Sequence, residues 1–281
     1  MGTLGIIAGF GRLPVLVARA VRGKYDRVVG IGVLESVDTE LSSVVDAYHA
    51  INIGQLSVLL ETLRQENITE VILIGKVNKD LLFQGIRLDD RMRALLSQLP
   101  DHSDDTLMLA FVSTLLSAGL KVLDQADYIP ALLATEGVLS ACQPSAEEWR
   151  DIEFGFAMAK EIGRLDIGQT IVVKQSAVLA VEAIEGTDAA IRRGGQLGKT
   201  GAVVVKVAKP LQDLRFDLPS VGSQTLQSMI DVDAKVLAVE AGKTLLVDRE
   251  ALVKMADEHN IAIVAIKRDS GNRESGNGTK L

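Results

Sequence analysis

Short apolar runs alternate with amphipathic segments along the first half of the chain. The runs are rich in Val and Ile and are bounded by Gly, Asp or Lys, a pattern typical of buried strands. The predicted strands are residues 4–9, 27–34, 47–53 and 70–77, and the predicted helices are residues 15–23 and 56–66. This βαβ alternation predicts a Rossmann-like α/β domain, in which a parallel sheet carries helices on both faces.

A glycine turn joins the first predicted strand to the first predicted helix. Gly9 and Gly11 precede Pro14, which suits a first helical turn because its missing N–H is not needed there. Such a turn lets backbone N–H groups approach a phosphate, and Glu35 is spaced like the ribose-binding acid of a dinucleotide fold. The glycine pattern of dinucleotide-binding folds is incomplete, because Pro14 stands where its third glycine would be. Three interpretations therefore remain: a nicotinamide site, a tight turn without a ligand, or a loop that contacts another nucleotide or phosphate. Lys76, at the same predicted sheet edge, is either a solvated lysine or a phosphate contact.

An apolar segment, residues 105–123, is predicted to be one helix after an acidic stretch. We favour a core helix. Alternatively it forms one wall of a groove for a lipid chain, because Ala110, Ser113 and Gly119 are small. The segment is too short and too rich in Ser and Thr to cross a membrane.

Periodicity is lost between Pro130 and Pro144, which predicts a boundary between two domains. We assign residues 1–135 to the Rossmann-like domain, residues 145–268 to a second α/β domain, and residues 269–281 to a polar, Gly-rich tail that we expect to be disordered. Ser145 and Glu148 form a capping-box pattern at the start of a helix that we expect Gly168 to close. Helices at 222–232 and 248–260 and strands at 235–242, 244–248 and 261–267 complete the second domain.

Residues 170–222 combine apolar runs with charged clusters. The predicted strands are residues 171–173, 178–184 and 202–207, and the second and third are followed by clusters of carboxylates, lysines and arginines. Charges at strand exits lie on loops that a sheet holds rigidly, so we expect a catalytic or binding site here.

Glu182 is the first candidate in this stretch, because strand alternation places it on a face with Val178, Ala180 and Ile184. A partly buried carboxylate requires a cation or hydrogen-bond donors. The candidate partners are Lys174, Arg192, Arg193 and Lys206. A purely structural ion pair explains Glu182 equally well. Thr187 and Asp188, which follow, are either the cap and first turn of a short helix or substrate contacts.

The cluster at residues 209–219 points to phosphorus chemistry. Asp213, Arg215 and Asp217 share one side of the chain if it is extended, with the two aspartates about 13 Å apart. One ion could not bind both unless the chain bends or Glu182 contributes. Mg²⁺ is commonly held by one or two carboxylates together with substrate phosphates, and nearby cations would neutralise phosphate oxygens. Asp217 is otherwise a turn residue before Pro219.

Composition and charge limit the classes of function. The net charge of −7 argues against general nucleic-acid binding. The single cysteine, Cys142, cannot form an intramolecular disulfide, which favours a reducing compartment, and the amino terminus does not resemble a signal peptide. His49, His102 and His259 are scattered, without metal-ligand spacing. We therefore expect a cytoplasmic protein that is either free in solution or peripheral to a membrane.

Motifs spread over nearly the whole chain carry a family resemblance. They are Gly5-Ile-Ile-Ala-Gly9-Phe-Gly11-Arg-Leu-Pro14, Ile74-Gly75-Lys76-Val77, Asp151-Ile-Glu-Phe-Gly155, Asp166-Ile-Gly-Gln169, Val181-Glu182-Ala-Ile-Glu185-Gly-Thr-Asp188, Val207-Ala-Lys209-Pro-Leu-Gln-Asp213, Arg215-Phe-Asp217-Leu-Pro219 and Val239-Glu240-Ala-Gly-Lys-Thr244. With these the chain resembles the UDP-2,3-diacylglucosamine pyrophosphatase family of lipid A biosynthesis, of the two-domain type unrelated to the metallophosphoesterase enzymes.

The resemblance implies a hydrolase that uses Mg²⁺ or Mn²⁺ to cleave UDP-2,3-diacylglucosamine into UMP and 2,3-diacylglucosamine 1-phosphate (lipid X). It also implies a homodimer in peripheral contact with the inner membrane. Asp217 matches the essential aspartate of the family. The catalytic candidates are Asp217, Asp213 and Glu182, of which Asp217 and Glu182 are also the metal-ligand candidates. The substrate-binding candidates are Gly9, Gly11, Lys76, Lys174, Gln175, Thr187, Asp188, Arg192 and Lys206.

Two other classes of function remain. An NAD(P)-dependent oxidoreductase would use the Gly9 turn and Glu35. A non-catalytic lipid- or nucleotide-binding module would bind the same lipid nucleotide and release no UMP.

Overall fold

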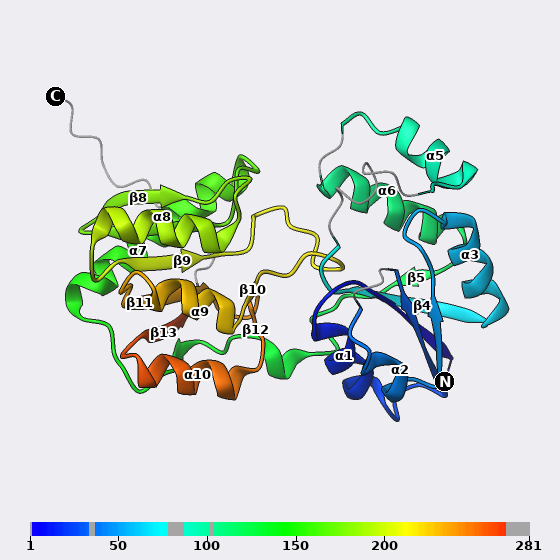
Figure 1. The fold of residues 1–281 in the computed structure, drawn as a ribbon, viewed down its shortest axis with the longest axis horizontal. Coiled ribbons are helices and arrows are strands. Elements are labelled where there is room, and N and C mark those ends of the chain that lie inside the picture. Colours follow the sequence, from blue (N-terminus) through cyan, green and yellow to red (C-terminus); the bar gives the residue numbers. More distant parts are fainter. Residues whose placement is uncertain (1, 34–36, 78–86, 102–103, 268–281) are drawn as a thin grey trace, which may run out of the picture. The chain divides into compact units, whose positions relative to one another are not determined.

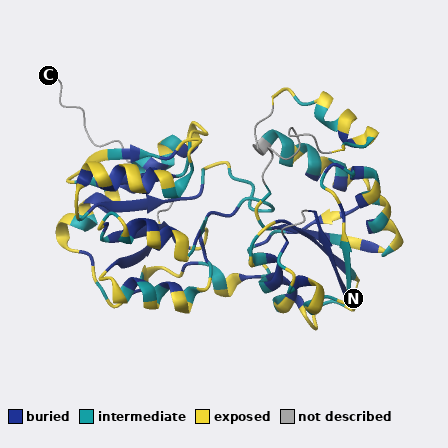
Figure 2. Ribbon diagram, in the orientation of Figure 1, coloured by how far each residue is buried: buried dark blue, intermediate teal, exposed yellow. Residues whose placement is uncertain are grey.

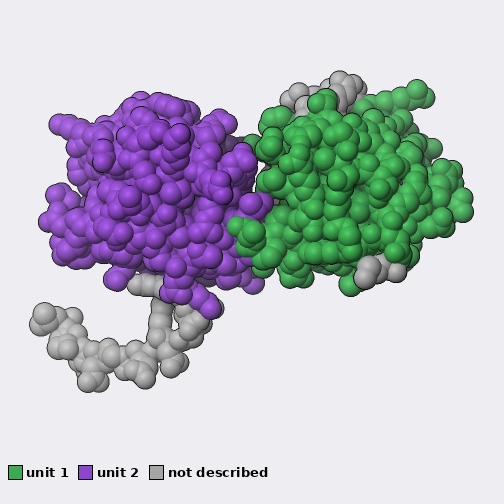
Figure 3. Space-filling view, turned by 90° about the horizontal axis from the view of Figure 1, so that it is seen from below, with its two compact units in different colours: residues 1–131, 213–218 green, residues 132–212, 219–281 purple. Residues whose placement is uncertain are grey.

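A computed structural model describes residues 2–33, 37–77, 87–101 and 104–267. The chain forms two compact units, drawn in different colours in Figure 3. Unit 1 consists of Met1–Ala131 together with Asp213–Leu218, and unit 2 of Leu132–Gln212 and Pro219–Leu281. The short segment Asp213–Leu218 therefore groups with unit 1, although the chain on both sides of it belongs to unit 2. The sequence pattern predicts two continuous domains, and it did not indicate that a segment of the second half groups with the first unit. Glu35, His102 and the tail lie outside the described residues.

Unit 1 contains a parallel sheet in the order β3-β2-β1-β4-β5. Figure 1 labels β4, β5 and the helices of this unit. Its strands are β1 (Thr3–Ala8), β2 (Arg27–Gly32), β3 (Ala47–Ala50), β4 (Ile68–Ile74) and β5 (Lys121–Val122). Its described helices are α1 (Leu13–Val21), α2 (Leu41–Val44), α3 (Leu56–Gln65), α5 (Asp90–Ser97) and α6 (Asp104–Ser117). The central strands are buried almost throughout (Figure 2), as parallel strands covered on both faces require. The predicted Rossmann-like parallel sheet is confirmed.

The predicted helix at residues 105–123 is too long. Helix α6 ends at Ser117, Gly119 adopts φ +83°, and β5 begins at Lys121. A glycine in the left-handed region ends a helix without strain, and the chain then turns back into the sheet. Val112 and Leu115 lie in the core, whereas Leu109 and Leu116 are about half exposed. One face of α6 is thus a core face, as predicted. None of the described helices is long and apolar enough to cross a membrane.

Unit 2 contains a mixed sheet in the order β6-β13-β11-β9-β7-β8. Strands β9 (Val203–Lys206), β11 (Val236–Glu240) and β13 (Ala262–Ile266) are mutually parallel. Strands β6 (Gly137–Val138) and β7 (Thr170–Lys174) run antiparallel to them, and β8 (Ala177–Val181) runs antiparallel to β7. Two short strands, β10 (Ser220–Val221) and β12 (Leu245–Leu246), pair separately. The prediction of a second α/β domain is confirmed.

Strand alternation divides the side chains of this sheet between two cores. On one face, Val203 and Val205 of β9 pack with Ile152 and Phe156 of α7 (Ala146–Arg164). On the other face, Val204 packs with side chains of α8 (Thr187–Gly198), α9 (Ser223–Ile230) and α10 (Arg249–Glu258). A single turn of 3₁₀ helix, Pro130–Leu132, lies at the boundary between the two units.

Helix α7 begins as predicted and ends differently. The Ser145 side chain accepts the Glu148 N–H at 3.2 Å and the Glu148 carboxylate accepts the Ser145 N–H at 2.7 Å, so the capping box is confirmed. The helix ends at Arg164, and Asp166 takes the left-handed conformation with φ +56°. Gly168 therefore does not close α7, and its small size serves a different contact, described below.

Candidate active site

Functional side chains gather at one edge of the unit 2 sheet. Strands β9, β11 and β13 end there with Lys206, Glu240 and Ile266, and the register pairs Glu240 with Ile266. Because β7 is antiparallel to β9, Thr170 at its start pairs with Lys206 at the same edge. Glu182 follows β8, and its N–H donates to the Thr170 carbonyl at 2.9 Å. We call this the carboxyl edge.

A polar chain links Glu182 to Lys206 on the α8 side of the carboxyl edge. The Thr187 hydroxyl donates to Oε1 of Glu182 at 2.8 Å and accepts from Nζ of Lys206 at 3.0 Å. Lys206 also donates to the carbonyl of Ser220 at 3.0 Å. Glu182 and Lys206 are only 8% and 7% exposed, so this group is desolvated and depends on its hydrogen bonds.

Two oxygens on this side have no hydrogen-bond partner within the described part of the chain. They are Oε2 of Glu182 and Oγ1 of Thr170, and both are buried. Buried polar atoms nearly always have a partner, and an exception calls for an unplaced water or ion or a functional role. The unpartnered Oε2 is therefore free to accept a bond from a bound group.

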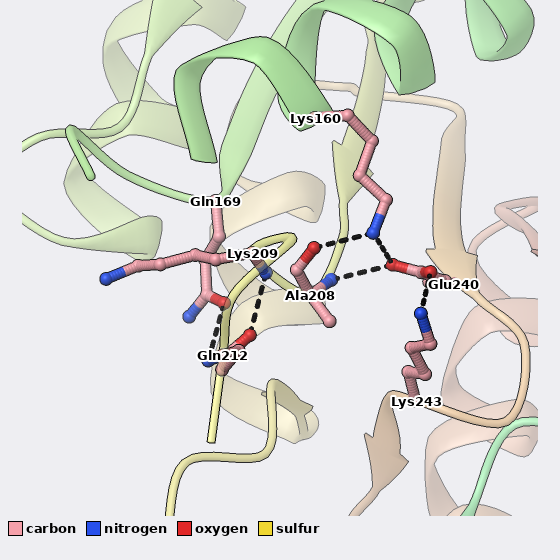
Figure 4. A network of polar contacts seen from close by, with 7 residues as sticks. All are labelled: Lys160, Gln169, Ala208, Lys209, Gln212, Glu240 and Lys243. Carbon is pink, nitrogen blue, oxygen red and sulfur yellow. Dashed lines mark hydrogen bonds and ion pairs between the residues drawn. The ribbon is translucent and has the colours of Figure 1, made fainter. Parts of the chain in front are cut away.

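A second group lies on the α7 side of the carboxyl edge (Figure 4). Oε2 of Glu240 accepts from Nζ of Lys160 at 2.5 Å and from the Ala208 N–H at 2.9 Å, and Oε1 pairs with Nζ of Lys243 at 3.1 Å. Lys160 also donates to the Ala208 carbonyl at 2.7 Å. Burial lowers the pKa of Lys160, and the nearby Glu240 carboxylate opposes part of this shift.

The loop that leaves β9 is tied to the loop that precedes β7. Nζ of Lys209 pairs with Oδ1 of Asp166 at 2.5 Å, and the Lys209 N–H donates to Oε1 of Gln212 at 2.8 Å. The side-chain amides of Gln212 and Gln169 meet at 3.4 Å, as Figure 4 shows. These contacts give the first part of the loop a defined course.

Asp213 and Asp217 lie further along that loop, in the segment that belongs to unit 1. Of the extended and bent arrangements that the sequence left open, the structure has the bent one, because the Asp217 N–H donates to the Asp213 carbonyl at 3.0 Å and closes a turn. The Arg215 guanidinium contacts both oxygens of Asp213, with Nη2 to Oδ2 at 2.5 Å, and holds the pKa of that carboxyl below its usual range. Phe216 packs against the unit 1 core and anchors the turn, and Asp217 is partly exposed.

Several predicted residues lie away from the carboxyl edge. Lys174 ends β7 at the opposite edge and donates to the carbonyls of Gly198 and Thr200 at 2.8 and 2.7 Å, so it caps the end of α8 and does not pair with Glu182. Gln175 lies in the adjacent hairpin turn with φ +51°. Arg192 contacts Asp231 at 3.8 Å.

Two details of the Glu182 segment also differ from expectation. Strand β8 stops at Val181, and Ile184 is fully exposed, so Ile184 does not share a buried face with Glu182. The cap of α8 is Gly186 and not Thr187, which leaves the Thr187 hydroxyl available to bridge Glu182 and Lys206. Asp188 lies in the first turn of α8, as predicted.

In unit 1 the Gly9 turn contacts Lys76 through the backbone. The N–H groups of Phe10 and Lys76 each donate to the carbonyl of the other at 2.7 and 2.9 Å. A Cβ on Gly9 would come within 2.6 Å of the Lys76 carbonyl, so only glycine permits this approach. Gly11 has φ +103° and open space around it, and the Lys76 side chain is exposed. The glycine turn and Lys76 are therefore neighbours, as the pattern predicts.

Lys160 and Glu240 were not among the site candidates, although Glu240 lies in one of the motifs that carry the family resemblance. The sequence signal for this pair was weak, because Glu240 ends an otherwise apolar strand pattern and lies 80 positions from Lys160.

Among the residues that the structure describes, no group of three or more His, Cys, Asp or Glu side chains is arranged to hold a metal ion.

Comparisons with known proteins identify the family. Residues 3–132 match the LpxI N-terminal domain, and residues 135–264 match the LpxI C-terminal domain. A Caulobacter vibrioides protein named UDP-2,3-diacylglucosamine pyrophosphatase LpxI is 31% identical over 277 residues, which cover 95% of this chain and 98% of that protein. With both domains matched and this identity over nearly its whole length, the chain belongs to the LpxI family.

Proposed function

We propose that this protein hydrolyses the pyrophosphate of UDP-2,3-diacylglucosamine in lipid A biosynthesis. The observation that carries the proposal is the 31% identity, over 95% of the chain, to a relative named for that activity. The carboxyl edge of unit 2 supports it, because buried Lys206 and partly buried Lys209 are cations suited to phosphate oxygens.

The reaction requires an activated water and a stabilised leaving group. The water oxygen forms a bond to one phosphorus of the pyrophosphate, and the bond from that phosphorus to the bridging oxygen breaks. The bridging oxygen leaves with the other phosphate, and the products are 2,3-diacylglucosamine 1-phosphate and UMP. A carboxylate takes the proton of the attacking water, and fixed cations stabilise the charge on the leaving phosphate.

We assign the general-base or water-orienting role to Asp217. Its backbone is held by the turn from Asp213, and the Phe216 anchor fixes the same segment. Asp213 is engaged by Arg215, which suits it to keeping the turn in shape and not to accepting a proton. We assign Lys206 and Thr187 to binding of phosphate oxygens or to orienting Glu182.

We further propose Mg²⁺ or Mn²⁺ as cofactor, with Glu182 as a carboxylate ligand and Asp217 as a ligand if it does not act as the base. The unpartnered Oε2 of Glu182 supports the first ligand, because carboxylate oxygens are the donors that these ions prefer. When bound, such an ion would polarise the phosphorus and neutralise phosphate charge. A homodimer and peripheral contact with the inner membrane, both implied by the family resemblance, remain proposals.

Hydrolysis in H₂¹⁸O tests the reaction and its direction. We expect one ¹⁸O atom per turnover, carried by one product only. Label in UMP would place the attack at the α-phosphorus. Label in the sugar phosphate would place the attack at the β-phosphorus.

The variant Asp217→Asn tests the assigned base. Its kcat should fall at least about a hundredfold, and calorimetry should confirm that the variant is folded. Near-normal turnover by the variant would remove Asp217 from the chemistry.

A further inference from the structure

A single ion pair holds both polar groups of one backbone residue at the exit of β9. The Ala208 N–H donates to Glu240, and the Ala208 carbonyl accepts from Lys160. Lys160 and Glu240 are themselves paired at 2.5 Å, so the three residues close a ring of polar contacts, drawn in Figure 4. We call Lys160, Ala208 and Glu240 the Ala208 clamp.

The clamp joins three elements at a buried position. Lys160 comes from α7, Glu240 from the end of β11, and Ala208 from the chain just after β9. Ala208 and Glu240 are 2% and 3% exposed. A buried carboxylate is stable only when donors surround it, and Glu240 has three: Lys160, Lys243 and the Ala208 N–H.

The position of the clamp gives it a task beyond stability. The chain continues from Ala208 through Lys209 and Gln212 into Asp213–Leu218, the segment with the proposed base Asp217. The clamp holds the start of this loop and Phe216 holds the turn further along it, so loss of the clamp leaves the Asp217 carboxylate with one restraint fewer. Catalysis is sensitive to such changes, because about 1 Å of misplacement can cost about a hundredfold in rate.

We propose that Glu240 and Lys160 are positioning residues for hydrolysis, which fix the Ala208 backbone and thereby the loop that carries Asp217. The proposal rests on the proposed function for its kinetic consequence only; its structural consequence is measured independently of activity.

Four variants separate positioning from simple stabilisation. Glu240→Ala removes the acceptor, whereas Glu240→Gln keeps an oxygen for the Ala208 N–H. Lys160→Met keeps the apolar stem of the side chain and removes the donor to the Ala208 carbonyl. The matched control is Asp151→Asn, because Asp151 is also a buried carboxylate and accepts the N–H groups of Gln175 and Ser176 at 2.8 and 2.6 Å, at the opposite edge of the sheet.

The first readout is amide hydrogen exchange of peptides covering residues 207–217, measured on the full chain. We expect faster exchange in Glu240→Ala and Lys160→Met, a smaller increase in Glu240→Gln, and no change there in Asp151→Asn. Unchanged exchange in Glu240→Ala would overturn the proposal, whether or not the protein hydrolyses the lipid nucleotide.

The second readout is the division of the effect between kcat and KM, measured below the unfolding temperature of each variant. We expect kcat to fall at least about tenfold in Glu240→Ala and Lys160→Met, with KM changed less than about threefold. Glu240→Gln should recover part of the lost kcat, and Asp151→Asn should keep a near-normal kcat.

A double variant tests whether the two residues act together. Because both hold the backbone of Ala208, the variant that combines Glu240→Ala with Lys160→Met should lose little more kcat than either single variant. If Asp151→Asn and Glu240→Ala lower the unfolding temperature equally and neither changes kcat, the clamp is structural only and the proposal is wrong.

Discussion

Gly168 lies directly against the backbone carbonyl of Glu182, so closely that a Cβ atom on Gly168 would overlap the carbonyl oxygen. The N–H of Glu182 is held from the other side by the carbonyl of Thr170. The backbone that presents the Glu182 carboxylate is therefore confined between the loop after α7 and the start of β7. The absence of a side chain at residue 168 is a requirement of the candidate active site.

Gly168→Ala should destabilise the protein. The added methyl group has to displace the Glu182 backbone, and overpacking of this kind lowers the free energy of unfolding by about 1–3 kcal/mol. Urea unfolding of unit 2, followed by the fluorescence of the single tryptophan, Trp149, measures the change. Gly222→Ala is the control, because a Cβ there meets only Val247 at 3.7 Å and the φ of −149° suits any residue. Equal stability of the two variants would contradict the close approach.

Thr187→Val should lower kcat, whereas Thr187→Ser should leave it near the parent value. Valine has the shape of threonine and cannot bridge Glu182 and Lys206, so two buried charged groups each lose a partner, which costs about 1–3 kcal/mol per group. Steady-state kinetics and calorimetry on the two variants measure the effect. Parent-like turnover and stability in Thr187→Val would show that the bridge has no role.

The Asp213–Arg215 pair predicts a pH dependence of stability. The Arg215 guanidinium, chiefly through its hydrogen bonds, lowers the pKa of Asp213 in the folded state. A lowered folded pKa contributes stability above the unfolded pKa of about 3.9, and this contribution is lost as the pH falls through the folded pKa. Parent and Asp213→Asn should differ in unfolding temperature at pH 7 and converge as the pH approaches 2. A difference that stays constant over this range would exclude the ion pair as its source.

Removal of divalent ions should abolish most of the hydrolysis. EDTA should suppress UMP release, and added Mg²⁺ or Mn²⁺ should restore it, because a carboxylate such as that of Glu182 supplies oxygens to such an ion. Glu182→Gln should raise the Mg²⁺ concentration needed for half-maximal activity. Full activity in EDTA, with the metal content checked by mass spectrometry, would remove the ion from the account.

The sequence predicts the sheets well because their strands are continuous apolar runs, and it predicts part of the site for the same reason. Glu182 and Lys206 each follow a run whose alternation directs them inward on the α8 side, and the structure links them through Thr187. The pattern of apolar residues does not indicate whether a strand runs parallel or antiparallel to its neighbours. Lys174 therefore looked equivalent to Lys206, whereas the antiparallel course of β7 places it at the opposite edge.

Long-range contacts were beyond a reading of local pattern. The Lys160–Glu240 pair joins residues 80 positions apart, and no spacing rule connects a helix lysine to a strand-end glutamate at that distance. The grouping of Asp213–Leu218 with unit 1 depends on Phe216 packing in a core made by another part of the chain. Gly168 looked like a helix stop because glycine commonly has that role, but Asp166 takes the left-handed position and Gly168 serves the Glu182 contact.

Chromatographic assay of UMP released from UDP-2,3-diacylglucosamine tests the central claim most directly. The full chain is incubated with the lipid nucleotide and Mg²⁺ beside Asp217→Asn, and both products are quantified. The account predicts equal amounts of UMP and 2,3-diacylglucosamine 1-phosphate from the parent and almost none from the variant. Intact lipid nucleotide after incubation with folded parent protein that binds it would contradict the claim and identify a binding module instead.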